Sequence, residues 1–252
     1  MRIRNSLRSG LGLALVATLF LPALSIGGAR PAAALGGELA KDEIARRNRS
    51  LARMLAESVP INRGLPVIES EAETRFPSAE EVTMRAVATL VVGMKGMGTP
   101  RAVIDKYVSD FGLTPWLSPE EKTFLAAPKP DDHIRMVHGW RVEASRVLFW
   151  SIGLVDRLDG PREQIEPAAL TALLQKQSRA GLLAKAKLRP VSAVLDQVDL
   201  IYCYRWALVD ENYHGRPAPA GLSDDIAMEW HQALNWLVRH DEEPWDDVSL
   251  DT

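Results

Sequence analysis

Residues 133–153 read HIRMVHGWRVEASRVLFWSIG, and this stretch decides the fold. It follows Pro130, and Asp131 or Asp132 is placed to cap the start of a helix. Apolar side chains recur along it at three- and four-residue spacing, which is typical of a helix with one buried face. This stripe consists of Val137, Trp140, Ala144, Val147, Leu148 and Ile152. We therefore predict one helix through the whole stretch and expect it to be the core helix of the domain.

Helical spacing of apolar residues continues on both sides of this stretch, while strict alternation of apolar and polar residues is scarce. Ser78 and Ser118 each precede a predicted helix as its cap, with a glutamate three residues later. Further helices are expected over about 41–57, 99–111, 167–177, 191–211 and 223–240. The glycine-rich segment 93–100 is interpreted as a turn between helices. The sequence predicts an all-α fold with a single multi-helix domain and a short extended loop near 59–70.

The helix predicted over 41–57 has Ile44, Leu51 and Leu55 near one face. Three arginines, at positions 46, 47 and 49, fall mostly off that face. We expect the apolar face to be buried and the arginines to lie toward solvent.

The N-terminus has the pattern of a secretory signal. Residues 1–10 carry three arginines and no acid, and the apolar run Leu11 to Leu24 is shorter than a membrane span. Small residues follow, with cleavage expected near Ala34, after the preferred motif Ala32 to Ala34, and with Gly27 to Ala29 as the alternative motif. We predict a signal peptide over 1–34, a linker over 35–41 and the helical domain over 42–252, exported to the periplasm or beyond from a bacterial cell, with no membrane span after cleavage.

The charge balance excludes some partners. Residues 1–34 hold four of the 30 basic side chains and none of the 33 acidic ones, so the mature chain is acidic. An acidic chain is a poor match for phosphate backbones, and no nucleic-acid partner is expected. Cys203 is the only cysteine, within a strongly apolar run, and is interpreted as a buried, inert thiol.

Several segments carry a family resemblance. The strongest are WRVEASRVLFWSIGLVDRL (140–158), DLIYCYRWALVD (199–210) and PWDDVSLDT (244–252), supported by GLPVIESEAE (64–73), SAEEVTMRA (78–86) and LSPEEKTFL (117–125). In order and spacing the chain resembles the domain of unknown function 4272 family, from about Asp42 to Thr252. No catalytic residue can be carried over from this family to the chain.

Charged side chains on the predicted core helix offer a first candidate site. Glu143 and Arg146 are three residues apart and are expected to pair. The structural interpretation is an ion pair that fixes helix packing. The functional interpretation makes Glu143 a general base with a raised pKa.

The helix over 191–211 carries Asp196, Asp199, Tyr202, Arg205 and Trp206. Two carboxylates one turn apart can hold a divalent cation or form an acid–base pair, although salt bridges to arginines are the favoured interpretation.

The last helix adds His231 and Asn235, four residues apart. No zinc motif accompanies them, so no metal site is predicted, and no cofactor is indicated.

The chain ends HDEEPWDDVSLDT from His240, and this acidic segment contains Trp245. Because a solvated tail has no need of an indole, we predict that Trp245 anchors the segment onto the bundle. Neighbouring acids such as Asp246 are expected to cap helix N-termini or to pair with Arg141 and Arg205.

The leading functional hypothesis is an exported, non-catalytic binding or interaction module whose polar-aromatic groove accepts a small molecule or a protein partner. The alternative is a hydrolase-like enzyme that uses Glu143, Asp196, Asp199 and His231, with or without a divalent ion. The candidate groove residues are Trp140, Arg141, Glu143, Asp196, Asp199, Tyr202, Arg205, Trp206, His231, Asn235, Trp245 and Asp246.

Overall fold

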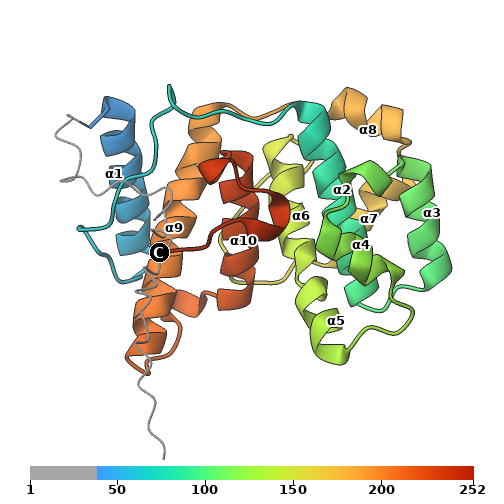
Figure 1. Ribbon diagram of the computed structural model, residues 1–252. Helices are drawn as coiled ribbons and strands as arrows, with labels where there is room; N and C mark the ends of the chain where they lie inside the picture. Colours follow the sequence, from blue (N-terminus) through green and yellow to red (C-terminus); the bar gives the residue numbers. More distant parts are fainter. Residues whose placement is uncertain (1–38) are drawn as a thin grey trace, which may run out of the picture.

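Helix α2 (Ala79–Gly96) is the hub of the fold in the computed structural model, which describes residues 39–252 (Figure 1). Its start is fixed by the predicted capping box, in which the Ser78 hydroxyl accepts from the Glu81 amide and the Glu81 carboxylate accepts from the Ser78 amide. Nearly every α2 side chain is buried, because helices α3 to α8 pack around it. The predicted signal peptide lies outside the described residues.

The remaining helices confirm the all-α prediction, and no β-strand occurs between residues 39 and 252. They are α1 (Lys41–Ala56), α3 (Arg101–Phe111), α4 (Pro119–Ala126), α5 (Asp132–Gly139), α6 (Arg141–Ser151), α7 (Pro167–Gln175), α8 (Arg179–Lys185), α9 (Val191–Tyr213) and α10 (Asp224–Leu237). Short 3-10 helices are η1 (Thr114–Trp116), η2 (Pro219–Gly221), η3 (His240–Glu242) and η4 (Trp245–Asp247). The sequence had not predicted α8, although Ser178 caps it through the Gly181 amide.

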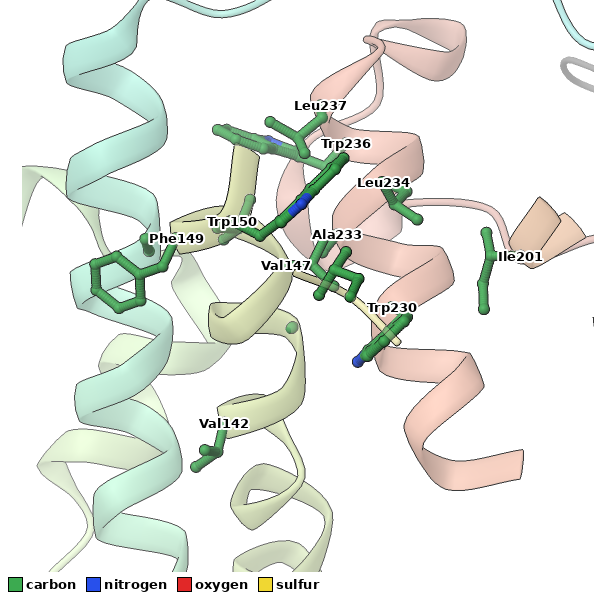
Figure 2. Packing of buried hydrophobic residues seen from close by; sticks show 14 of the residues in the cluster. Val142, Val147, Phe149, Trp150, Ile201, Trp230, Ala233, Leu234, Trp236 and Leu237 are labelled. Atoms are coloured by element: carbon green, nitrogen blue, oxygen red, sulfur yellow. The ribbon is translucent and has the colours of Figure 1, made fainter. Parts of the chain in front are cut away.

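The helices form successive layers from one end of the molecule to the other (Figure 1). Helix α6 packs on α2 and on α10, α10 packs on α9, and α9 packs on α1. Figure 2 shows α6 between α2 and α10, with Phe149 directed toward α2. Phe149 and Trp230 are almost fully buried. Burial of one such side chain contributes about 1.5–3 kcal/mol, so this interface is a main source of stability.

The prediction of one helix through 133–153 was wrong in one respect, because the chain bends at Trp140 and forms α5 and α6 instead. Helices α2 and α5 cross closely at Gly96 and Gly139, where a Cβ added to Gly96 would lie 2.4 Å from the Gly139 amide nitrogen. Glycine has a weak helix propensity and permits this approach. The expected burial holds for α6, but Val137 on α5 is 40% exposed.

The expected orientation of α1 was also wrong. Ile44 and Leu55 are exposed, whereas Arg46 and Arg47 are buried, and only Leu51 of the expected face is in the interior. The cause is the predicted extended loop at 59–70, whose backbone carbonyls accept hydrogen bonds from these two arginines. Arg46 donates to the carbonyls of Ile68 and Glu69, and Arg47 donates to those of Leu65 and Pro66.

No helix within residues 39–252 is both long enough and apolar enough to cross a membrane.

Candidate functional site

Arg141, the first residue of α6, joins α6 to α10. Its Nη1 lies 3.2 Å from a Glu229 carboxylate oxygen and also donates to the Gln232 side-chain oxygen. Burial raises the pKa of Glu229 to about 6, and the charge of Arg141 opposes that rise. The Arg141 guanidinium also lies 5.9 Å from the centre of the Trp245 ring. The Arg141 side chain therefore connects α6, α10 and the C-terminal segment.

Glu143 is completely buried on α6, and its carboxylate is fully engaged. One oxygen accepts from the Ile165 amide at 2.6 Å, and the other accepts from Trp230 Nε1 at 3.1 Å. Arg146 lies 3.7 Å away, which confirms the predicted ion pair. Arg146 also covers the Trp230 ring at 5.3 Å. These contacts give Glu143 a structural role, since a buried carboxylate needs this compensation.

Asp196 and Asp199 each pair with a different arginine of α1. Asp199 accepts from Arg47 at 2.8 Å, with side chains only 1% and 9% exposed. Asp196 accepts from Arg49 at 2.5 Å, with side chains 35% and 55% exposed. The salt bridges favoured from the sequence are thus present, one buried and one at the surface. Within the described residues, no cluster of three or more histidine, cysteine or acidic side chains is suited to a metal ion.

Tyr202, His231 and Asn235 meet where α9 packs on α10. The Tyr202 and His231 rings are 6.4 Å apart, and Asn235 Nδ2 donates to His231 Nε2 at 3.1 Å and to the Ser249 carbonyl at 2.9 Å. Burial lowers the pKa of His231 to about 3 and raises that of Tyr202. Both side chains are therefore uncharged at neutral pH. The buried His231 Nδ1 has no hydrogen-bond partner in residues 39–252.

Three other candidates lie at the edges of these contacts. Arg205 pairs with Asp224 at the start of α10, and burial of the Arg205 guanidinium lowers the pKa of Arg205. Trp140 and Trp206 are half-buried and pack against the hydrophobic core. Cys203 is buried, and burial raises its pKa to about 12, as expected for an inert thiol.

The C-terminal segment docks as predicted. Trp245 is 5% exposed, its ring meets Trp236 edge-on at 5.8 Å, and its carbonyl accepts from Gln232 at 3.0 Å. Arg85 of α2 covers the same ring at 4.7 Å. Asp246 accepts from the Glu120 amide and so caps the N-terminus of α4. Arg141 and Arg205 instead pair with carboxylates of α10, so capping is the role that Asp246 takes.

These contacts place the twelve candidate residues in several small, well-packed groups. Arg141, Trp245 and Asp246 belong to the junction of α6, α10 and the C-terminal segment, and Tyr202, His231 and Asn235 to the junction of α9 and α10. Glu143, Asp196 and Asp199 lie in three separate ion pairs. The assignment of these residues to a ligand site stays a prediction.

A groove that the sequence did not predict lies between α3 and α7, which both pack on α2. It consists of two hollows of about 490 and 310 Å³ that share Val103, Tyr107 and Gln175. These volumes fall in the range of small-molecule sites. We call this feature the α3–α7 groove.

The lining of the α3–α7 groove mixes apolar and polar side chains, and its charged groups lie at one end. Apolar walls come from Val103, Tyr107, Phe111, Leu174, Met94 and Met97. Lys106, Asp110, Gln177 and Arg179 line the larger hollow. The sequence signal for this groove is the four-residue spacing of Val103, Tyr107 and Phe111 along one helical face. This spacing cannot show that α7 lies across the groove from α3.

Residues 39–252 thus form an all-helical domain with a hydrophobic core, several buried ion pairs and a groove at the surface. Residues 46–248 match the family described as Domain of unknown function (DUF4272), and the chain belongs to that family. No curated protein and no solved structure matches the chain.

Proposed function

We propose that this protein is an exported, non-catalytic binding module and that its ligand occupies the α3–α7 groove. The observation that carries this proposal is the groove itself, which combines ligand-sized volume with an apolar floor and a few polar groups. Met97 and Val103 are 46% and 39% exposed there, so a ligand would remove apolar surface from water.

The interior of the protein supports a non-catalytic role. A general base needs a carboxylate that can accept a proton from a substrate. Glu143 instead accepts two internal N–H groups, and Asp199 accepts from Arg47. His231 is 2% exposed and hydrogen-bonded to Asn235. These groups hold helices together, and each lacks the access that a substrate requires.

Export is the second part of the proposal and rests on the arginine-rich and apolar pattern of residues 1–24. Expression of the full chain in a bacterium and mass measurement of the periplasmic protein test it. The expected chain begins near Leu35. An intact chain that stays with the cytoplasmic fraction would contradict export.

A thermal-shift screen of small molecules tests the binding role. Val103→Asp places a charge in the α3–α7 groove, and Val209→Asp is the matched control, because Val209 is also exposed but lies on α9. Compounds that stabilise the wild type are expected to stabilise Val209→Asp equally and Val103→Asp much less. If the active compounds stabilise all three proteins alike, the groove is not the binding site.

A further inference from the structure

The α3–α7 groove is asymmetric, and the asymmetry indicates what it binds. One hollow is lined by Met94, Met97 and Ala168 with no charged side chain, whereas the other contains both Lys106 and Arg179. Val103 and Tyr107 continue from one hollow into the other. A ligand that fits both hollows therefore has an apolar body and a polar end.

Arg179 has donor capacity left at the polar end. Its Nη2 donates to Glu80 at 3.1 Å. Its buried Nε has no hydrogen-bond partner within residues 39–252. A guanidinium is a rigid fork of N–H donors that matches a carboxylate with two parallel hydrogen bonds. The side chain is 37% exposed and lines the larger hollow.

The charged side chains of the lining are each paired, and Arg179 is the one among them with a buried N–H that has no partner in the described part of the chain. Among the lining residues, Lys106 and Arg179 are basic and Asp110 is the one acid. Lys106 and Asp110 pair with each other at 2.6 Å, and both are largely exposed. Arg179 pairs with Glu80 at 3.1 Å, so these charges are balanced, and the selectivity for an anion comes from the Arg179 guanidinium, which carries only donors and has one N–H without a partner within residues 39–252.

We propose that the α3–α7 groove binds an amphipathic monocarboxylate, with its apolar tail along Val103 and Tyr107 and its carboxylate at Arg179. This inference rests on the proposed function, because it names the class of ligand for the same groove. Arg179 is the residue that selects the anion.

Isothermal titration of the full-length protein with decanoate and with decanol tests the inference. The two probes share a tail and differ in the head group. Decanoate is expected to bind the wild type about tenfold more tightly than decanol does, the size of effect of a charged hydrogen bond. Arg179→Gln should remove this preference and leave decanol binding unchanged. Arg157→Gln, at an exposed arginine outside the groove lining, should behave like the wild type.

The outcomes separate the two proposals. If decanol binds as tightly as decanoate, or if Arg179→Gln keeps the preference, the anion inference is wrong and the binding role stands. If neither probe binds while compounds from the thermal-shift screen do, the ligand class is also wrong. If Val103→Asp binds both probes as the wild type does, the groove is not the site and the proposed function fails with the inference.

Discussion

Replacement of Asp199 by asparagine is the most informative single change in the interior. The substitution keeps the shape of the side chain and leaves Arg47, which is 9% exposed, without a counter-charge. Loss of one partner of a buried ion pair typically costs about 3–5 kcal/mol. Arg47 retains the carbonyls of Leu65 and Pro66 as acceptors, so we expect the low end of this range, about 3 kcal/mol.

Asp196→Asn is the matched control, because it breaks the other ion pair between the same two helices. That pair is exposed, with side chains 35% and 55% accessible, and exposed pairs contribute about 0–1 kcal/mol. The two variants thus differ mainly in the burial of the ion pair that each one breaks.

Thermal melts and urea titrations of both variants measure the difference. For a domain of this size, about 3 kcal/mol corresponds to a melting temperature roughly 6–12 °C lower. Equal destabilisation by Asp196→Asn and Asp199→Asn would refute the reasoning that burial decides the worth of each pair. A stable Asp199→Asn protein that has lost an activity would favour the enzyme hypothesis instead.

Three further predictions concern the C-terminal segment, the buried histidine and the close helix crossing. Deletion of residues 244–252 removes the buried indole and should cost about 3 kcal/mol or more, so an unchanged melting temperature would contradict the docked cap. His231 has a lowered pKa in the folded state, so its contribution to stability is present above about pH 6.5 and is lost as the pH falls toward 3. Between pH 6 and 5, urea midpoints should show the wild type losing about 1 kcal/mol more than His231→Gln does, and identical pH slopes would count against a buried neutral imidazole. Gly96→Ala should destabilise the protein strongly, because its Cβ would lie 2.4 Å from the Gly139 backbone. Gly139→Ala should be tolerated, because its Cβ would meet nothing closer than 3.7 Å. Denaturation midpoints compare the two variants, and similar midpoints would argue against the close crossing of α2 and α5.

The helix starts that the sequence predicted correctly are determined by residues close by in the chain. Ser78 and Ser118 cap their helices through groups within the next three residues, so the pattern and the structure coincide. The Glu143–Arg146 pair could also be predicted from the sequence, because residues three apart on a helix lie on neighbouring positions of its surface. The anchoring by Trp245 could be predicted because an indole among acidic residues indicates a buried contact.

The errors arise where distant segments decide the outcome. Arg46 and Arg47 are buried because the loop at 59–70 runs past α1 and presents its carbonyls, and helical periodicity treats arginine as a surface residue. The helix break at Trp140 lies next to Gly139, which is in close contact with Gly96 more than forty positions earlier in the chain, and helical periodicity within 133–153 cannot show such a contact. The α3–α7 groove likewise exists only through the placement of α3 and α7 on α2.

The methyl NMR spectrum of protein labelled at its methionines tests the central claim most directly. Met94 and Met97 line the α3–α7 groove, whereas Met54 and Met84 are fully buried elsewhere in the core. Addition of a compound that stabilises the full-length protein should shift the Met94 and Met97 methyl signals and leave those of Met54 and Met84 in place. Saturating binding with the Met94 and Met97 signals unmoved would contradict the claim that this groove is where the protein binds its ligand.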